Sequence, residues 1–471
     1  MIKEQEKPFI HLLRSPNSGY FFDVNRNEIV PVSDEAFQFL SQVMKDERLI
    51  DESAPEEILE LKENRYLSSH HSTALLHPLT SKIESYLNEN VVSLCLQVTQ
   101  NCNLRCEYCI YSETSNKKQR SHTNKHMTLD IAKKAVDFYY NHSSNTREAA
   151  IGFYGGEPLL EMDLIRQIVS YAEDLFEGKR LLFNVTTNCT LLTPDVVDYM
   201  MAHNFAITIS LDGPKRIHDR FRRFKDKGSF DKLIEHMQYI EKNYPDDLQK
   251  ISISMVIDPH NDFDEINSVF NQFPMFKYLP INAAIVDDSY SEEKLEMPGK
   301  YIEKAQYQMF LGFLYMFERL DKEYVSPIVR PTVYKRFTDK DKWKKTVSLS
   351  NIGVAGGQCT PGSRRLFCTV DGRFFPCERV SESSEVMCIG SLNEGFNYEA
   401  IRNQLNVGKI TEHECCSCWA VNNCMQCIRC ADGEISLSST ERLSHCTKFQ
   451  NDVEQLLLDI IMINEMEYMY R

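Results

Sequence analysis

Three cysteines, Cys102, Cys106 and Cys109, stand close together with three and then two residues between them. A run of this kind ligates three irons of a four-iron cluster and leaves the fourth iron free for a substrate. A ferredoxin-type run would supply four thiolates, and a zinc site usually pairs two C-x2-C knuckles. The run therefore predicts an iron–sulfur cluster with one open iron. The alternative is three unrelated thiols or a partial zinc site.

The cysteine run directly follows residues 91–99, which have the apolar pattern of a buried strand. The cluster would therefore lie where a strand ends and a loop begins. The motif C-x3-C-x-aromatic-C, with Tyr108 at the aromatic position, resembles the signature of the radical SAM (S-adenosylmethionine) enzymes. The resemblance implies that the open iron binds SAM, and that reductive cleavage yields a 5′-deoxyadenosyl radical that abstracts hydrogen from the substrate.

Strands and helices alternate from residue 91 to about residue 287, with amphipathic helical segments such as 129–140 and 164–176. Parallel strands joined by right-handed helical crossovers curl into a barrel, and the reactive loops follow the carboxyl ends of the strands. We predict an α/β fold with a partial (β/α)6 TIM-like barrel, as the resemblance also implies. The predicted strands are 91–99, 149–154, 181–186, 205–211, 251–257 and 279–286.

Motifs similar to those of the radical SAM family follow the second, third and fourth of these strands. Glycines in the first motif, Gly155-Gly156-Glu157-Pro158, would let a ligand approach the main chain. Position 189 departs from the family's T-T-N-G, and we expect Cys189 to be a small buried residue without backbone strain. Arg222 and Arg223 are expected on a solvated charged face. The resemblance implies that SAM is bound by Gly155, Gly156, Glu157, Thr187, Asn188, Ser210 and Asp212.

Eleven of the 16 cysteines lie between positions 359 and 446. Their spacing resembles the SPASM extension, an iron–sulfur domain with two auxiliary four-iron clusters, so the resemblance implies three [4Fe-4S] clusters in all. It assigns one auxiliary cluster to Cys415, Cys418, Cys424 and Cys446, and the other to Cys359, Cys377 and Cys427.

The spacing of the last two block cysteines departs from the family, which makes Cys430 a rival of Cys427 as a ligand. The cluster on Cys359 and Cys377 would then lack a fourth protein ligand, and its open iron could bind a substrate thiolate. Glu378 stands where related maturases carry a catalytic aspartate. It is therefore a candidate base, with an ordinary salt bridge as the alternative. A zinc site on Cys415, Cys418, Cys424 and Cys427 is the alternative for the block.

The first part of the chain predicts three short strands, 9–14, 19–24 and 28–32, followed by helices that begin after Ser33 and after Ser53. This winged-helix-like order is similar to domains that capture the leader of a precursor peptide as an added strand. A generic small α+β unit is the alternative. We expect a last helix over 448–463 that packs on the barrel. The predicted domains are 1–88 for peptide recognition, 89–290 for the barrel, 291–352 for a helical bridge and 353–471 for the SPASM domain.

Composition is that of a folded protein, with 42% apolar and 26% charged residues. No apolar run approaches the ~20 residues of a membrane helix, and no signal segment follows the N-terminus, so we expect a cytoplasmic protein with reduced cysteines. The net charge of −15 argues against nucleic acid as a partner.

The whole chain resembles a radical SAM/SPASM maturase of a cysteine-rich ribosomal peptide (a RiPP maturase). The function we predict is the joining of a cysteine sulfur to the carbon of another residue, which makes a thioether crosslink. The alternatives are a carbon–carbon crosslinking or epimerising peptide maturase, and an anaerobic sulfatase-type maturase that makes formylglycine. The expected partners are a precursor peptide, bound through its leader, and an electron donor of the flavodoxin or ferredoxin type.

Overall fold

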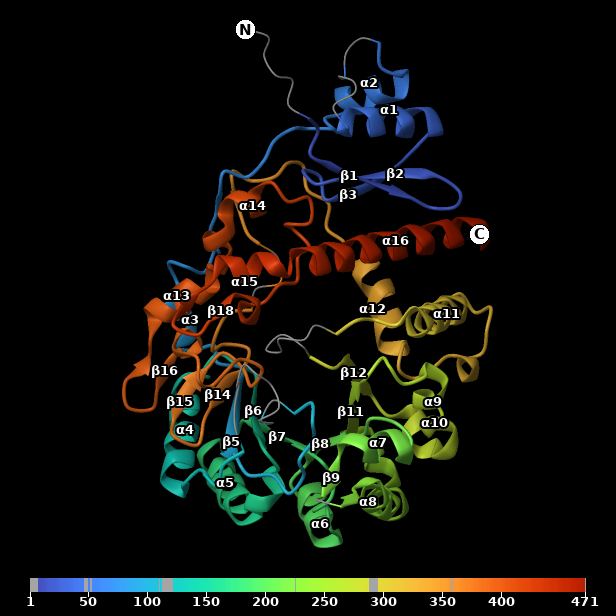
Figure 1. Ribbon diagram of the computed structural model, residues 1–471. Coiled ribbons are helices and arrows are strands. Elements are labelled where there is room, and N and C mark those ends of the chain that lie inside the picture. The colour runs from blue at the N-terminus through green and yellow to red at the C-terminus, as the bar shows by residue number, and fades with distance from the viewer. Residues whose placement is uncertain are drawn as a thin grey trace.

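The computed structural model describes residues 7–45, 50, 53–109, 111, 122–224, 226–287, 295–355, 357 and 359–470. Figure 1 shows an open barrel, mostly in teal and green, and a small N-terminal unit at the opposite end of the molecule. The long last helix, α16 (Cys446–Tyr470), runs between them. Among the helices of the described chain, none combines the length and apolar character that crossing a bilayer requires.

The N-terminal unit is a three-stranded antiparallel sheet with two helices. Ser33 caps the first helix as predicted, because its hydroxyl accepts from the N–H of Ala36. The second helix begins later than the Ser53 spacing predicts, with Pro55 at the N-cap. A residue before proline avoids helical angles, so Ala54 cannot be the first helical residue and Ser53 cannot be the N-cap. The elements are β1 (Ile10–Arg14), β2 (Gly19–Asp23), β3 (Glu28–Val32), α1 (Asp34–Met44) and α2 (Glu56–Glu63).

The two faces of this sheet have different neighbours. One face forms a small core with α1 and α2 that extends to Leu67. The other face packs on α16, and the residues of this contact are Phe9, Leu13, Phe22 and Val24 of the sheet and Val453, Leu457 and Ile461 of the helix. The expectation that the last helix packs on the barrel is therefore wrong for most of its length. Only Met462 and Ile463 of α16 reach the main core.

Six parallel strands form the open barrel in the order β12-β11-β8-β7-β6-β5. They match the predicted strands within a few residues and confirm the predicted α/β fold with a partial barrel. The strands are β5 (Ser93–Thr99), β6 (Glu148–Gly155), β7 (Arg180–Thr187), β8 (Phe205–Ser210), β11 (Ile251–Ile257) and β12 (Ile281–Ile285). The helices are α4 (Leu129–Asn141), α5 (Met162–Leu175), α6 (Pro194–Ala202), α7 (Lys215–Phe221), α8 (Phe230–Asn243), α9 (Phe263–Asn267) and α10 (Val269–Gln272).

The C-terminal segment extends the barrel sheet, because β14 (Leu366–Cys368) pairs in parallel with β5. Cys368 is fully buried there. The sheet continues through β15 (Arg373–Phe375), β16 (Gly390–Ser391) and β17 (Gly395–Phe396). The segment's helices are α13 (Tyr398–Leu405), η6 (Val407–Thr411), α14 (Glu412–Cys416), η7 (Ile428–Ala431) and α15 (Ser439–Ser444), and α11 (Gly299–Met316) and α12 (Arg330–Asp341) form the bridge.

Two short elements inside the predicted first domain belong elsewhere by their packing. β4 (Ala74–Leu75) pairs with β13 (Ile352–Gly353), and α3 (Ile83–Leu87) buries its apolar side chains in the main core. We therefore propose that the compact N-terminal domain ends directly after Leu67.

Candidate functional site

The cysteine loop begins at the carboxyl end of β5, as the strand prediction requires. The Sγ of Cys102 accepts a hydrogen bond from the N–H of Leu104 at 3.4 Å, and the N–H of Cys109 donates to the carbonyl of Cys106 at 3.1 Å. Burial raises the pKa of Cys102 and of Cys106 to about 12. Thiols in this environment become thiolates when a metal takes the place of the proton.

In the described residues, no three His, Cys, Asp or Glu side chains gather closely enough to bind a single metal ion. A four-iron cluster makes a different demand, because each cysteine binds its own iron and the sulfurs stand farther apart. The thiols of Cys102, Cys106 and Cys109 are close enough to affect one another's charge, and three such thiols on one loop can serve three irons of a cluster.

The glycines after β6 are required by the cysteine loop itself. A Cβ on Gly155, whose φ is +133°, would lie 2.1 Å from the carbonyl oxygen of Thr99, and a Cβ on Gly156 would lie 2.1 Å from that of Asn101. The N–H groups of Gly156 and Glu157 donate to these same carbonyls at 3.0 and 2.9 Å. We expected the glycines to admit a ligand, but they admit the main chain that carries the cysteines.

Glu157 connects the loops that follow β6 and β7. Its carboxylate accepts from the hydroxyl of Thr187 at 2.8 Å and from the N–H of Asn188 at 2.8 Å. The side chain of Asn188 then donates to the Sγ of Cys102 at 3.8 Å and to Asn103 at 2.8 Å. The structure thus brings the predicted Glu157, Thr187 and Asn188 together with the cysteine loop. Burial raises the pKa of Glu157 to about 7.

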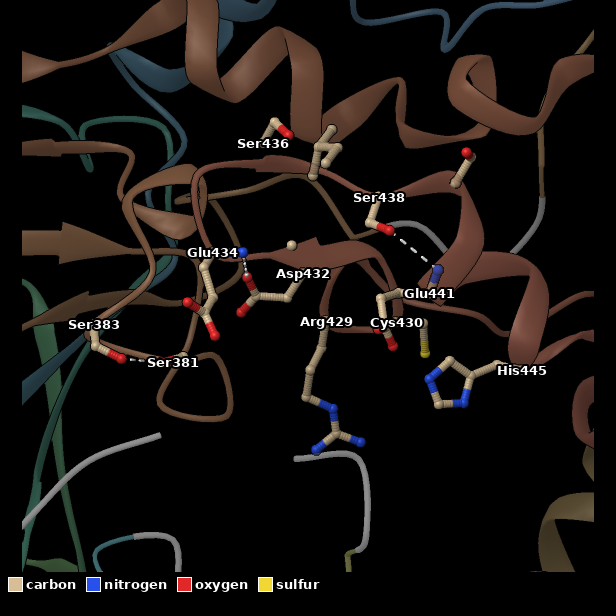
Figure 2. Close-up of a pocket in the computed structure, with 13 residues that line it drawn as sticks. Ser381, Ser383, Arg429, Cys430, Asp432, Glu434, Ser436, Ser438, Glu441 and His445 are labelled. Carbon is tan, nitrogen blue, oxygen red and sulfur yellow. Dashed lines mark hydrogen bonds between the residues drawn. The ribbon is translucent and has the colours of Figure 1, made fainter. Parts of the chain in front are cut away.

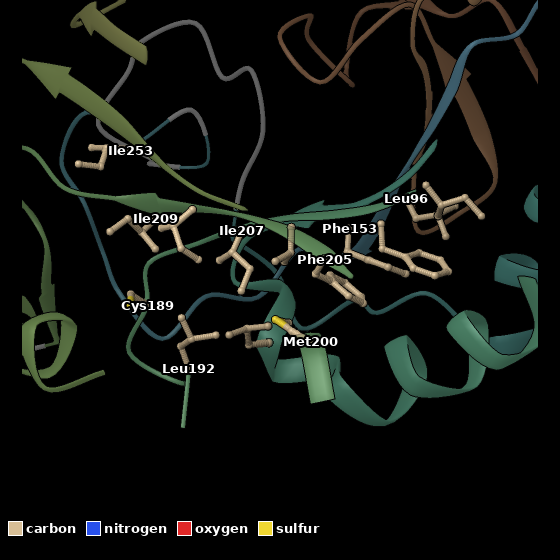
Figure 3. Close-up of a cluster of buried hydrophobic side chains, with 14 of the residues drawn as sticks. Leu96, Phe153, Cys189, Leu192, Met200, Phe205, Ile207, Ile209 and Ile253 are labelled. Atoms are coloured by element: carbon tan, nitrogen blue, oxygen red, sulfur yellow. The ribbon is translucent and has the colours of Figure 1, made fainter. Parts of the chain in front are cut away.

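Cys189 is a core residue, as predicted, and Figure 3 shows it among apolar side chains that include Leu192, Ile209 and Met200. Its backbone is strained, however, with a φ of +69°, so the expectation of relaxed angles is wrong. A left-handed conformation costs a non-glycine residue roughly 1–2 kcal/mol. The carbonyl of Cys189 bonds the ring of His236 at 2.7 Å, which holds this turn in place.

Asp212 belongs to a buried network beside the cysteine loop. Arg222 donates to it at 2.8 and 3.2 Å, the N–H of Val256 donates at 3.1 Å, and the hydroxyl of Tyr108 also donates to it. The Arg222 guanidinium lies over the Tyr108 ring, 5.5 Å from its centroid. Arg222 is buried, so the expected solvated face is wrong for it and holds only for the exposed Arg223.

The charge of Arg222 alone is typical of a surface residue, and only its helical position indicates burial. His218 lies one turn before Arg222 on α7, and both side chains are buried. Residues four positions apart, such as His218 and Arg222, lie on the same side of a helix. Because this helix follows the Ser210-to-Gly213 motif at a strand end, that side faces the barrel interior. Burial lowers the pKa of His218 to about 3, so the ring is neutral. Ser210, at the end of β8, is 8% exposed.

Seven cysteines of the C-terminal segment lie in two groups. Burial raises the pKa of Cys359 and of Cys377, and the nearby Cys427 adds to the rise at both. Burial also raises the pKa of Cys424 and of Cys446, and the nearby Cys415 and Cys418 add to the rise there. The zinc alternative needs Cys427 with the second group, but the structure places it with the first. A hydrogen bond with Cys430 lowers the pKa of Cys427 and raises that of Cys430.

A polar pocket of about 430 Å³ lies beside Cys430. Figure 2 shows the Arg429 side chain extending away from the Cys430 main chain, with Asp432 and Glu434 farther along the same wall. Arg429 pairs with Asp287, which follows β12, so this pocket lies next to the carboxyl end of the barrel. Its remaining walls include Ser381, Ser383, Ser436, Ser438, Glu441 and His445.

Glu378 follows Cys377 and is 7% exposed. One carboxylate oxygen pairs with Arg365, whereas Oε2 is buried and has no hydrogen-bond partner in the described chain. Burial acts to raise the pKa of Glu378, but the Arg365 charge outweighs it and the pKa is lowered. The salt bridge expected as the alternative is present, and one oxygen remains able to accept a proton.

Comparison with known proteins shows what the part of the chain that holds this site is similar to. Residues 96–273 match the model of the Radical SAM superfamily. A cysteine-type anaerobic sulfatase-maturating enzyme of Clostridium perfringens (strain 13 / Type A) is 23% identical over 376 residues, which cover 75% of this chain and 92% of that protein. The solved structure "Native anSMEcpe with bound AdoMet" superimposes with a TM-score of 0.57 at 19% identity over 79% of this chain and 99% of the other, a likeness of fold alone.

Other relatives match over a shorter stretch. A cysteine-type anaerobic sulfatase-maturating enzyme of Clostridium novyi (strain NT) is 29% identical over 147 residues, and a serine-type enzyme of Bacteroides thetaiotaomicron is 28% identical over 181 residues. These matches cover 31% and 36% of this chain, and 38% and 43% of the two relatives. The chain thus spans less than half the length of these curated relatives.

We expect the burial of Glu157 to make stability depend on pH. Its folded pKa of about 7 is above its ordinary value of 4.5, so its contribution is fully present below about pH 4.5 and is lost as the pH rises through 7. The loss is at most ~3 kcal/mol. Thermal unfolding of the parent and of Glu157→Gln from pH 5 to 8 checks this, with the exposed Glu177→Gln as control. A parent-to-variant difference that stays constant with pH would contradict it.

Proposed function

Since residues 96–273 form a radical SAM domain, we propose that this chain is an enzyme that cleaves SAM on a four-iron cluster held by Cys102, Cys106 and Cys109. The observation that carries the proposal is the direct bonding of the cysteine loop to the loops after β6 and β7, through Glu157 and Asn188. When bound, the clusters and SAM supply a 5′-deoxyadenosyl radical and take up the electron that the oxidised substrate gives back.

The residues predicted to bind SAM divide into two groups by their contacts. Gly156, Glu157, Thr187 and Asp212 use their polar groups within the protein and position the loops. Asn188 bonds Cys102 and Asn103 through its amide and also positions the cysteine loop. Ser210 lies at the carboxyl end of β8, and we propose that it contacts SAM directly. Gly155 gives the turn its left-handed angle.

We propose two auxiliary four-iron clusters on the two cysteine groups of the C-terminal segment. The hydrogen bond from Cys430 favours the thiolate of Cys427, which supports Cys427 as the ligand beside Cys359 and Cys377. That group has three cysteines, so one iron is open to a substrate thiolate. The pocket beside Cys430 gives a peptide a polar route to it.

The substrate we propose is a cysteine-rich ribosomal peptide, and the product is a thioether between a cysteine sulfur and the carbon of another residue. Each linkage removes two hydrogens. One leaves as a hydrogen atom to the deoxyadenosyl radical, and the other leaves as an electron and a proton. Oε2 of Glu378 can take this proton, because Arg365 holds only the other oxygen.

Formylglycine formation is the second candidate. It is favoured by the relatives, several of which are named as anaerobic sulfatase-maturating enzymes. It uses the same radical step and the same proton acceptor, but it needs no leader peptide. The N-terminal sheet is the feature that separates the two candidates.

We propose that this sheet binds the leader at β1. The N–H of Val24 donates to the carbonyl of Phe9. Along an antiparallel pair, every second residue bonds the partner strand through its main chain. Counted from Phe9, the N–H and C=O of Leu12 therefore point away from β2. The N–H of Leu12 has no main-chain partner in the described residues. The other edge, β3, has Pro31 at an outward position, which removes a donor. β1 is therefore the better edge for an added strand.

Replacing Cys102, Cys106 and Cys109 together with Ala should abolish the production of 5′-deoxyadenosine, because the cluster that binds SAM loses all three of its protein ligands. Anaerobically reconstituted parent protein should contain about twelve irons per chain and the variant about eight, by the arithmetic of four-iron clusters. Chromatography of the products and iron analysis check both. Continued SAM cleavage by the variant would refute the site, and about four irons in the parent would refute the auxiliary clusters.

Leu12→Pro should weaken the binding of the leader peptide at least tenfold, because it removes an outward N–H from β1. Ile29→Pro is the matched control on β3: its N–H also points outward, and we expect no change in affinity. Isothermal titration of the two variants with the leader measures this. Equal affinity of Leu12→Pro and the parent would rule out the β1 edge.

Mass spectrometry of the product distinguishes the two candidate functions. Co-expression with a cysteine-rich precursor should give a loss of two hydrogens per linkage, with fragmentation blocked between the joined residues. Conversion of a sulfatase cysteine to formylglycine, with the precursor unmodified, would establish the second candidate instead.

A further inference from the structure

The second cysteine group, Cys415, Cys418, Cys424 and Cys446, is surrounded by hydrogen-bond donors. The hydroxyl of Thr411 lies 3.3 Å from the Sγ of Cys415, and Nε2 of Gln450 donates to the Sγ of Cys418 at 3.4 Å. Nε2 of Gln426 donates to the Sγ of Cys446 at 3.7 Å. Three of the four sulfurs therefore have a side-chain contact of this kind.

Arg442 decides the direction of the contact at Cys415. Its Nε lies 3.2 Å from the oxygen of Thr411, and a guanidinium only donates. The Thr411 oxygen therefore accepts from Arg442, and its own proton is free to point at the sulfur. The result is a relay from Arg442 through Thr411 to Cys415.

Arg442 is also a buried charge that faces this group. It is 2% exposed, and its Nη1 has no hydrogen-bond partner in the described chain. A buried cation is costly unless a negative group lies nearby. Its contact with Thr411, whose hydroxyl reaches Cys415, places the guanidinium beside this group. A four-iron cluster with four thiolates is anionic, so it would supply the negative charge that the buried Arg442 guanidinium needs.

The first cysteine group has nearby charges that are paired with one another. Glu378, which follows Cys377, pairs with Arg365, and Arg429, two residues after Cys427, pairs with Asp287. Hydrogen bonds to the sulfurs and nearby charge are among the factors that set the potential of an iron–sulfur cluster. Donors and an unpaired cation stabilise the reduced, more negative form, whereas a cation that already has a carboxylate partner does so less.

We propose that Thr411, Arg442 and Gln450 raise the reduction potential of the cluster on Cys415, Cys418, Cys424 and Cys446 above that of the other auxiliary cluster. A single electron given to the pair then resides on the cluster beside α16. These three are positioning residues, and the inference rests on the auxiliary clusters of the proposed function.

The test is a redox titration followed by electron paramagnetic resonance, with dithionite as the one-electron donor. The full-length chain carries Cys102→Ala, Cys106→Ala and Cys109→Ala so that only the auxiliary clusters give a signal. Thr411→Val and Gln450→Leu should each lower the midpoint potential of the higher-potential cluster by about 59 mV, a tenfold change in its reduction equilibrium. Arg442→Lys should shift it less than Arg442→Met, because it keeps the charge.

Gln455→Leu is the matched control, since Gln455 also lies on α16 but bonds Asp459 and no cysteine. It should titrate as the parent does. The inference would be overturned if the Thr411→Val and Gln450→Leu variants kept about eight irons and titrated as the parent does. That outcome would leave the proposed auxiliary clusters in place. About four irons in the background chain would instead refute the auxiliary clusters, and with them the inference.

Discussion

The close contact between the cysteine loop and the loop after β6 is the constraint on which the site depends. Side-chain atoms have no room where Gly155 and Gly156 meet the carbonyls of Thr99 and Asn101. The register of β5 against β6 shifts between Gln97 and Thr99, which turns the chain toward these glycines. Two neighbouring strand ends are thereby joined through their main chains. Because main-chain contacts do not depend on rotamers, the cysteine loop has a defined place before any metal arrives.

Buried polar side chains extend this frame to the next strands. Glu157 ties the loop after β7 to the first contact, and Asp212 with Arg222 ties α7 and β11 to Tyr108 on the cysteine loop. Unpaired charges would be costly in this interior, but each carboxylate accepts several donors. The network thus converts a loop-based site into one held by five strands of the barrel, β5, β6, β7, β8 and β11.

The sequence predicted the barrel well because its strands are buried on both faces and read as short apolar runs with clear ends. The same approach failed where tertiary contacts decide. Arg222 has the composition of a surface residue, and only its position one helical turn after His218 places it inside. Cys189 adopts a left-handed angle because neighbouring contacts hold it there. The last helix has an apolar face that the sequence reveals, but a pattern cannot say whether the barrel or the N-terminal sheet covers it.

The placement of that helix brings the proposed peptide-binding edge close to a proposed cluster ligand. The His11 ring on β1 stacks on Trp419 with the centroids 3.6 Å apart, and Trp419 directly follows Cys418. The same strand packs Leu13 against α16, the helix that carries Gln450 and begins at Cys446. A peptide added to the edge of β1 would therefore lie one side chain away from a proposed cluster ligand. Removal of the N-terminal unit would expose the apolar face of α16 beside that proposed ligand. A truncated chain could therefore lose activity for a reason other than the loss of leader binding. A change confined to the outward edge of β1 leaves this packing intact.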